Sequence, residues 1–507
     1  GRLLQAIGTL EALADKFFPE HYDRIVAAFV EVVVRALEDQ KPAELGYVLT
    51  RSSDGHNDRR CENNPLPQLQ EDPTMPVIAV RRAGVVDAVV ASYAYHGTVL
   101  GLDDLTLSGD MGAVVEQKIA ETFDHPVTVL FLNSWGADMS PGDPGVDAAL
   151  PASEIPGRFE RMEGLGVKLA SVVRPAVDSI AFRSDAEVRT RTYVARLDRE
   201  VMEYDEETFV QFPHGGAFCG LGGQGSCDAV SRLEALDELC VKAVEGELPT
   251  QTMISAGQVG ALAFVTGPGE WSTNLAARVL DKARARTGGD VMFIGYAQDF
   301  TGYSLDEADW WQGGYETSGA LWGPRQGEYL AARAIESFET FFDTFTTPPF
   351  PQPSPLAPFS GYAGYAPYVP EAGKDVGTVA VDVPEVVGPT DLVTFTVRGS
   401  DPWLGTPVAV LERGDGGGAF APVTKRNTQP VDSDSYDMWV HLAVDPPYVK
   451  GERLPERSFS WTFHFPVTRR TATAFPPLTS GTPHRITVKV PTPNGDVSVS
   501  SRPFALQ

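Results

Sequence analysis

The chain has 507 residues, of which 42% are hydrophobic and 21% are charged, and its formal net charge is −27. This length predicts more than one domain, and the composition is that of a folded globular protein rather than a disordered one. The negative charge argues against a nucleic-acid binder, because binding to phosphate backbones requires clustered Lys and Arg. No apolar stretch approaches the roughly 20 residues needed to span a bilayer.

The first part of the chain alternates helical and extended patterns, which predicts an α/β (α+β) domain with a mixed sheet over residues 1–345. Residues 25–37 have the period of an amphipathic helix, and Ile25, Phe29, Val32 and Ala36 share one of its faces. A helix is also expected over 112–123, and another after Ser272 or Thr273, either of which can serve as its N-cap. Strands are expected over 85–95, 127–132, 262–265 and 291–294.

The C-terminal part has a different pattern. Residues 346–375 are rich in Pro and Gly and are interpreted as a linker. Beyond them the helical period disappears, and short alternating runs separated by turn residues predict an all-β immunoglobulin-like sandwich over 376–507. The expected strands are 392–397, 408–411, 438–444, 459–465, 486–490 and 497–501.

Three chemically versatile side chains follow predicted strands directly: His96, Glu270 and Tyr303. Polar groups at strand ends are where open α/β sheets build sites, and a His with a carboxylate is a plausible catalytic zinc set. Spacing alone leaves the structural alternatives open. These are a hydrogen-bonded His, a Glu that caps a helix and a half-buried Tyr.

Two other patterns carry less weight. Ser140 follows a buried strand but has no Gly-x-Ser-x-Gly context, so an α/β-hydrolase triad is not supported and a turn serine is the simple reading. Residues 220–225 match a dinucleotide-binding glycine pattern, yet no strand leads into them, and we interpret them as a loop. This loop lies between two of the four cysteines, which predict one or two disulfides or buried free thiols: Cys61, Cys219, Cys227 and Cys240.

A series of short segments, all within residues 1–345 and in one order, forms a family pattern. They are Arg51-Ser52 with Asn63-Asn64-Pro65, Tyr95-His96-Gly97-Thr98, Leu107-Ser108-Gly109-Asp110, Gly136-Ala137-Asp138-Met139-Ser140-Pro141, Pro268-Gly269-Glu270-Trp271-Ser272-Thr273, Phe300-Thr301-Gly302-Tyr303-Ser304, and Gln312 with Tyr315-Glu316-Thr317-Ser318 and Trp322-Gly323-Pro324. Together these segments resemble the neutral/alkaline (non-lysosomal) ceramidase family.

The resemblance implies a zinc-dependent amide hydrolase that cleaves N-acyl sphingosine, or a related N-acyl lipid, into a fatty acid and an amine. It implies that His96, Glu270 and Tyr303 bind the zinc ion and that Ser140 lies beside it. Arg51 and Tyr315 would line the pocket. Whether Ser140 attacks the substrate or orients it is left open.

The sequence also departs from the family. The resemblance implies one more zinc-ligand His, in a His-Thr-His-Ser-Gly-Pro segment that we expect to precede Gly1. Gly142 stands where the family has Asn, and Gly319-Ala320 where it has Ser-Thr. These differences leave two alternatives: hydrolysis of another amide or ester, or a non-catalytic envelope or binding protein. The expected partner is a lipid, with peripheral membrane contact and no nucleic acid, and the expected location is secreted or cell-envelope/periplasmic.

Overall fold

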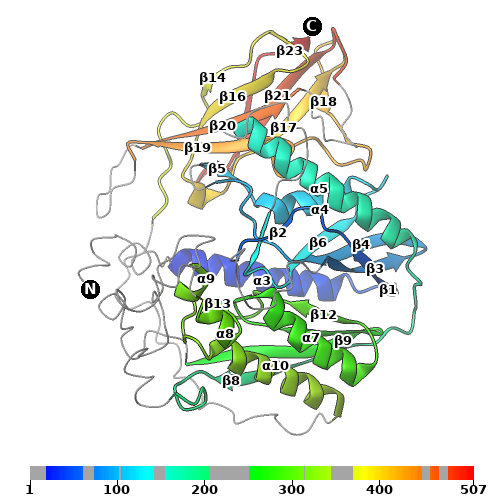
Figure 1. Cartoon of the computed structure of the whole chain (residues 1–507). Helices are drawn as coiled ribbons and strands as arrows, with labels where there is room; N and C mark the ends of the chain where they lie inside the picture. The colour runs from blue at the N-terminus through cyan, green and yellow to red at the C-terminus, as the bar shows by residue number, and fades with distance from the viewer. Residues whose placement is uncertain are drawn as a thin grey trace. The chain divides into compact units, whose positions relative to one another are not determined.

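The computed structural model describes residues 19–60, 73–101, 104–141, 155–204, 250–312, 315–343, 369–447, 457–467 and 478–507. Within these ranges the fold is mixed α/β, with several sheets and few helices (Figure 1). The chain divides into two compact units. Unit 1 comprises residues 1–96, 130–142 and 175–365, and unit 2 comprises 97–129, 143–174 and 366–507.

The first sheet of unit 1 has the strand order β1-β3-β4-β6. Its strands are β1 (Glu44–Arg51), β3 (Thr74–Arg82), β4 (Val85–Tyr93) and β6 (Thr128–Asn133). A tight turn joins β3 to β4, and both of its central residues, Ala83 and Gly84, have positive φ. The predicted strands 85–95 and 127–132 are therefore confirmed, and the first of them ends at Tyr93, just before His96.

The second sheet of unit 1 has the order β12-β10-β9-β8. Its strands are β8 (Val188–Arg196), β9 (Gln251–Val259), β10 (Leu262–Thr266) and β12 (Val291–Ile294). Helix α7 (Thr273–Thr287) connects the parallel strands β10 and β12, and α10 (Gln326–Asp343) packs on α7 and β9. The α7 N-cap is Ser272, as predicted, and the helix ends at Gly288 in the left-handed conformation.

Two small strand pairs and two short helices of unit 1 follow the ends of its sheets. The antiparallel pair is β2 (His56–Asp58) with β7 (Met139–Pro141), and the parallel pair is β11 (Glu270–Trp271) with β13 (Tyr303–Ser304). The helices are α8 (Glu307–Trp310) and α9 (Tyr315–Ser318).

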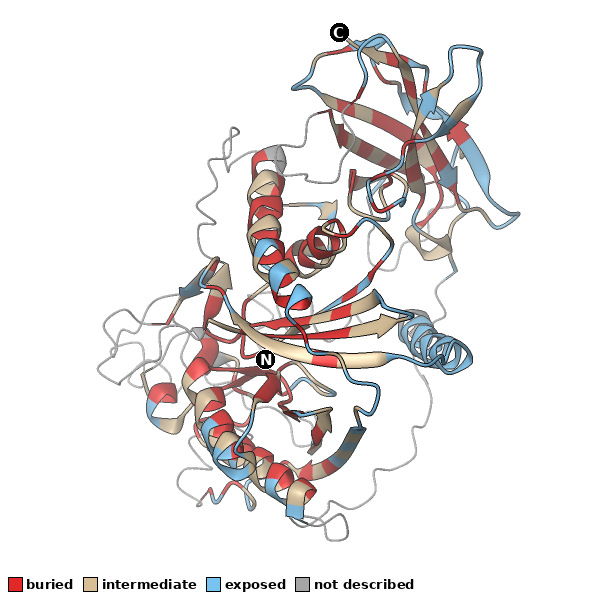
Figure 2. Ribbon diagram, turned by 90° about the vertical axis from the view of Figure 1, so that its right-hand side faces the viewer, coloured by how far each residue is buried: buried red, intermediate tan, exposed pale blue. Residues whose placement is uncertain are grey.

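Helix α3 (Pro19–Glu38) confirms the helix expected from the pattern of residues 25–37. Its side chains from Tyr22 onward are exposed, so the helix is pale blue in Figure 2. Phe29, for example, is 70% exposed and Val32 is 64% exposed. No helix in the ranges described above is long and apolar enough to cross a membrane.

Unit 2 contains two sheets that share one hydrophobic core. One sheet has the order β14-β16-β20-β19-β5, and the other has the order β15-β23-β21-β17-β18 with β22 paired to β21. The strands are β5 (Thr106–Leu107), β14 (Val379–Val381), β15 (Val386–Val387), β16 (Leu392–Gly399), β17 (Val408–Gly414), β18 (Phe420–Pro422), β19 (Trp439–Asp445), β20 (Ser458–Pro466), β21 (Pro483–Val490), β22 (Val497–Ser500) and β23 (Phe504–Leu506).

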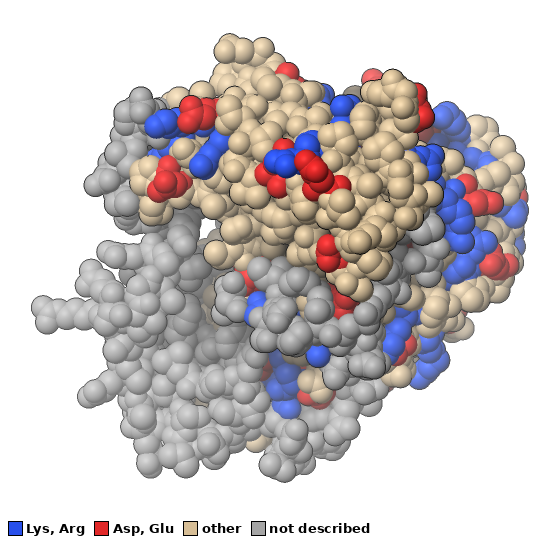
Figure 3. Space-filling model, turned by 90° about the horizontal axis from the view of Figure 1, so that it is seen from above, with Lys and Arg blue, Asp and Glu red and all other residues tan. Residues whose placement is uncertain are grey.

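The core of unit 2 comes from alternate residues of facing strands, which appear as red bands in Figure 2. Phe395 of β16, Trp461 of β20 and Ile486 of β21 are fully buried. All six strands predicted for this part are confirmed, while the immunoglobulin-like classification stays a prediction. On the face seen in Figure 3, acidic and basic side chains lie side by side, although the chain is strongly acidic as a whole.

Unit 2 also takes in segments from the middle of the chain. They include α4 (Asp110–Ala120) and most of α5 (Ile155–Asp178). Strand β5 pairs with β19, and the Gln117 side chain of α4 donates a hydrogen bond to Asp437 at 3.0 Å. The predicted linker lies largely outside the described residues, and the domain limits at 345 and 376 stay predictions.

Candidate active site

The ends of the two sheets of unit 1 meet at the loops that follow β6 and β12. The Ser134 hydroxyl donates to the Phe293 carbonyl at 3.0 Å, and the Gly295 amide donates to the Asn133 carbonyl at 3.2 Å. A Cβ atom at Gly295 would collide with the Ser134 carbonyl, so this close approach requires glycine. The polar residues that follow these strands are therefore brought together.

His96 follows β4 and is fixed by the backbone of β7. Its amide donates to the Met139 carbonyl at 2.9 Å, and its ring Nδ1 lies 3.2 Å from the same oxygen. The ring Nε2 lies 2.8 Å from Oε2 of Glu270. The side chains of His96 and Glu270 are only 12% and 10% exposed, so the pair is largely shielded from water.

Glu270 and Tyr303 are direct neighbours in the parallel pair β11–β13. The Glu270 amide donates to the Gly302 carbonyl at 2.9 Å. Gly269, just before, has a φ of +67°, and a Cβ there would also collide with the Gly302 carbonyl. The Tyr296 hydroxyl donates to Glu270 Oε2 at 3.0 Å. Burial, together with the charge of Glu270, raises the pKa of Tyr296, so its hydroxyl keeps its proton and remains a donor.

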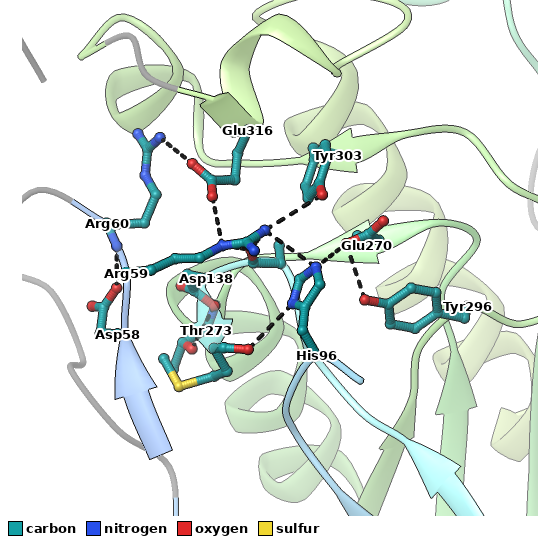
Figure 4. A network of polar contacts seen from close by, with 12 residues as sticks. Asp58, Arg59, Arg60, His96, Asp138, Glu270, Thr273, Tyr296, Tyr303 and Glu316 are labelled. Atoms are coloured by element: carbon teal, nitrogen blue, oxygen red, sulfur yellow. Dashed lines mark hydrogen bonds and ion pairs between the residues drawn. The ribbon is translucent and has the colours of Figure 1, made fainter. Parts of the chain in front are cut away.

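Arg59 lies at the centre of this cluster, directly after β2 (Figure 4). Its Nε lies 2.8 Å from Oε1 of Glu316, and its Nη2 donates to the Ala137 carbonyl at 2.7 Å. The same Nη2 lies 3.2 Å from His96 Nε2 and donates to the Tyr303 hydroxyl at 3.4 Å. The Arg59 side chain is 7% exposed. Burial is the largest single influence and opposes its charge, but Glu316, Tyr303 and Glu270 together outweigh burial and raise the pKa of Arg59, which keeps it cationic.

The contacts of the His96 ring cannot all be ordinary hydrogen bonds. A neutral ring with its proton on Nδ1, facing Met139, presents an Nε2 lone pair that suits Arg59 but faces the Glu270 carboxylate. A doubly protonated ring suits Glu270 but then faces the cationic Arg59. No single protonation state of the ring therefore satisfies both Arg59 and Glu270.

The chemistry of this donor set fits a divalent cation such as zinc. Imidazole nitrogen, carboxylate and phenol oxygen are ligand types that zinc accepts, and the Arg59 guanidinium already serves as a stand-in cation for His96 and Tyr303. In their present positions, however, these side chains do not have the spacing of a zinc site. His96 Nε2 and Glu270 Oε2 are 2.8 Å apart, closer than the about 3.4 Å that separates two ligands of one tetrahedral zinc ion. Within the described ranges, no group of three His, Cys, Asp or Glu side chains is arranged as a metal site.

A second, fully buried ion-pair network backs Arg59. Arg60 pairs with Asp309 at 2.9 Å and with Glu316 at 3.0 Å. Its backbone amide donates to Asp58, whose pKa burial raises to about 6. Glu316 pairs with Arg59 through one carboxylate oxygen and with Arg60 through the other, and it thereby holds both guanidinium groups in place.

Asp138 connects the loop before β7 to helix α7. Its carboxyl group accepts hydrogen bonds from the Thr273 amide at 2.8 Å and from the Thr273 hydroxyl at 2.9 Å. The residue is 1% exposed, and burial, followed by the charge of Asp58, raises the pKa of Asp138 to about 8. The contact ties the segment that carries Met139 to the segment that follows Glu270.

The structure thus brings together the three predicted metal ligands, His96, Glu270 and Tyr303. Ser140 lies in β7 opposite Asn57, half-buried, and directly follows the Met139 carbonyl that holds His96. The other two predicted site residues are Arg51 and Tyr315.

Arg51 ends β1 and is exposed, and among the described residues no hydrogen bond or ion pair joins it to the cluster. Tyr315 begins α9, and its side chain lies outside the described part of the structure. The glycine pattern at 220–225, the segment 63–65 and all four cysteines also lie outside the described residues.

Three members of the cluster were missed by sequence reasoning: Arg59, Tyr296 and Asp138. The adjacent pair Arg59-Arg60 was only a weak signal, because arginines need acidic partners only where they are buried, and the chain has other consecutive arginines, such as Arg81-Arg82. Asp138 lies within the quoted segment 136–141 and Tyr296 lies just after the predicted strand 291–294, but their partners are far away in the sequence.

The fold and the strand-end cluster place the chain in a defined structural class: it has a neutral ceramidase-like fold. The crystal structure of neutral ceramidase from Pseudomonas aeruginosa superposes with a TM-score of 0.70 at 17% identity and covers 96% of this chain and 80% of that one. A ceramidase complexed with C2 has a TM-score of 0.66 at 15% identity, with coverage of 93% and 79%. No protein-family model and no curated protein sequence matches the chain. The resemblance seen in the sequence motifs is therefore confirmed at the level of the fold.

Proposed function

We propose that this protein is a zinc-dependent amide hydrolase that cleaves ceramide or a related N-acyl lipid into a fatty acid and an amine. The observation that carries the proposal is the convergence of His96, Glu270 and Tyr303 from three separate strand ends. The sequence singles out the same three residues by their chemistry and by their positions after predicted strands. A chance selection of strand-end residues would not gather in one shielded cluster.

Each proposed ligand is oriented by a second group of the chain. The Met139 carbonyl favours the proton of His96 on Nδ1, which leaves Nε2 unprotonated and directed into the cluster. The Tyr296 hydroxyl holds one oxygen of Glu270, and the parallel β11–β13 register holds Tyr303 beside it. When bound, a zinc ion would polarise the amide carbonyl and lower the pKa of a water molecule.

The other groups have roles that follow from their charge and position. Arg59 keeps a permanent positive charge at the cluster, where it can stabilise the oxyanion that develops as an amide carbonyl is attacked. Ser140 is placed by β7 next to the His96 anchor and either attacks the substrate or orients it. Arg51 and Tyr315 are proposed to line the pocket on the basis of the family resemblance alone.

The lipid substrate is supported by the names of the structural neighbours, a neutral ceramidase and a ceramidase complexed with C2. We extend this substrate class to the present chain as part of the proposal. Peripheral contact with a membrane and a secreted or periplasmic location belong to the same proposal, because a lipid amide is delivered from a membrane surface.

The test is hydrolysis of a fluorescent short-chain ceramide by the full chain, with and without a zinc chelator. We expect release of the fatty acid that the chelator abolishes and that added zinc restores. A panel of other N-acyl amides and esters is measured in parallel. Turnover of another panel compound but not of ceramide would identify that compound's class as the substrate instead of ceramide. No turnover of any compound would contradict the hydrolase proposal.

A further inference from the structure

Arg59 makes two kinds of contact through one guanidinium group. Two of them anchor it: the ion pair with Glu316 at 2.8 Å and the hydrogen bond to the Ala137 carbonyl at 2.7 Å. The other two reach further, to His96 Nε2 at 3.2 Å and to the Tyr303 hydroxyl at 3.4 Å. The reaching contacts are the longer ones, so they are the weaker pair.

The atoms that Arg59 reaches are the atoms expected to bind metal. A guanidinium group has five N–H donors and no acceptor, so it can take up the single lone pair of His96 Nε2 and donate to the Tyr303 hydroxyl, and it then stands where a cation would contact both atoms. A second positive charge at the same point would be strongly repelled in a cluster whose members are only about one-tenth exposed. Guanidinium and metal ion therefore exclude each other at these two atoms.

We propose that Arg59 competes with the metal ion for His96 and Tyr303, so that the guanidinium closes the site in the metal-free protein and withdraws when the metal binds. The inference rests on the metal-binding part of the proposed function and concerns its regulation. Withdrawal breaks the two longer contacts of Nη2, whereas Nε can keep its ion pair with Glu316 at 2.8 Å and its hydrogen bond to the Ala137 carbonyl at 3.1 Å. The positive charge then stays beside the metal and remains available to the substrate.

Arg60 shows why this role belongs to Arg59. Both arginines pair with Glu316, but the Arg60 guanidinium is also held by the side chain of Asp309 at 2.9 Å and by its carbonyl at 3.1 Å. Arg60 is therefore engaged by acidic and carbonyl groups away from His96. Arg59 is the arginine whose contacts are divided between a fixed anchor and the expected ligands.

The experiment measures zinc affinity directly, by competition with a chromophoric chelator, on the metal-stripped full chain and its Arg59→Met variant. Methionine keeps a similar side-chain length without donors or charge. Because a hydrogen bond to a charged group is worth about ten- to a hundredfold in an equilibrium constant, we expect Arg59→Met to bind zinc at least about tenfold more tightly. Equal or weaker binding by the variant would overturn the proposal.

Two further variants keep the result interpretable. Arg59→Met leaves Glu316 with one arginine fewer, so the double variant Arg59→Met/Glu316→Gln removes both charges and is expected to show the same gain if the single variant folds poorly. Arg81→Met removes a half-exposed arginine that pairs with Glu44 at 2.8 Å, far from the cluster in the first sheet, and is expected to bind zinc like the wild type. Circular dichroism confirms that each variant is folded.

Hydrolysis of the fluorescent ceramide separates this inference from the proposed function. Tighter zinc binding by Arg59→Met, in a protein that hydrolyses no substrate, would support the competition and contradict the hydrolase. If the wild type hydrolyses the substrate but binds zinc no more weakly than Arg59→Met, the hydrolase would be supported and the competition contradicted. Absence of zinc binding in every variant would overturn the competition together with the metal site.

Discussion

The polar cluster around His96 and the two-sheet core of unit 2 are built from opposite kinds of sequence information. Along β20 every second residue is fully buried, from Phe459 through Trp461 and Phe463 to Phe465. The cluster instead takes single residues from segments as far apart as Arg59 and Glu316. A period of two can be read from neighbouring residues, whereas a cluster of isolated residues has no local period.

The two regions also differ in what they contribute energetically. Burying apolar side chains in the unit 2 core stabilises the fold in proportion to the area removed from water. Buried ion pairs such as Arg60–Glu316 lose solvation that their mutual attraction only partly returns. We therefore expect changes in the cluster to affect chemistry first and changes in the core to affect stability first.

The largest expected effect is on activity. His96→Ala removes the imidazole that faces Glu270, and we expect hydrolysis of the fluorescent ceramide to fall by at least about a thousandfold. The midpoint of thermal unfolding should change less than activity does, because the ring faces a polar cluster rather than an apolar core. His125→Ala, which removes a histidine paired with Asp124 in unit 2, is the matched control and should keep full activity. Retained activity in His96→Ala would show that the cluster is not the active site.

The opposite variant tests the core. Trp461→Ala deletes a fully buried indole whose N–H donates to the Ser400 carbonyl at 3.0 Å, and we expect unfolding free energy to fall by about 3–5 kcal/mol. Denaturant titration measures this loss, and Trp461→Phe should lose distinctly less because it leaves a smaller cavity. Zinc affinity of the folded protein should be unchanged. If Trp461→Ala altered zinc binding as strongly as stability, the contrast between the two regions would fail.

Asp138 gives the cluster a predicted pH dependence. In the folded protein the pKa of its carboxyl group is raised to about 8, whereas the ordinary pKa of an Asp side chain is 3.8. The native state therefore binds more protons than the unfolded state between these values, and the free energy of unfolding should fall as the pH rises from about 4 to 8. Asp138→Asn, which imitates the protonated form, should flatten this fall. Unfolding midpoints of both proteins are measured from about pH 4 to 8. If the midpoints of wild type and variant changed in parallel with pH, the raised pKa of Asp138 would be contradicted.

The smallest expected effect concerns the end of helix α7. Gly288 has a φ of +67° and Gly289 does not have a left-handed φ, while a Cβ atom at either position would meet nothing within 4 Å. Gly288→Ala should therefore lower the unfolding free energy by about 1 kcal/mol through backbone strain alone. Gly289→Ala should be neutral or slightly stabilising. Activity should be unchanged in both, and equal stabilities would show that α7 does not need the left-handed C-terminal residue.

Much of the fold was predictable because its elements follow local patterns. The strand at 291–294, the Ser272 cap of α7 and the six C-terminal strands all rest on periodicity or on neighbouring residues. The grouping of α4 with unit 2 was not predictable, since it depends on pairing of β5 with β19 more than 330 residues later. Such long-range pairing leaves no trace in the local pattern.

The sequence by itself determined those strands and helices that have a clear local period, and it singled out His96, Glu270 and Tyr303 as strand-end residues with the chemistry of ligands. Only the tertiary structure decided that these three meet and that Arg59 lies between them. Only it decided that Asp138 caps the segment after Glu270 and that Arg51 stays apart at an exposed strand end. The physical reason is that secondary structure follows from neighbouring residues, whereas the partner of a buried charge is chosen by the packing of sheets whose strands are distant in sequence.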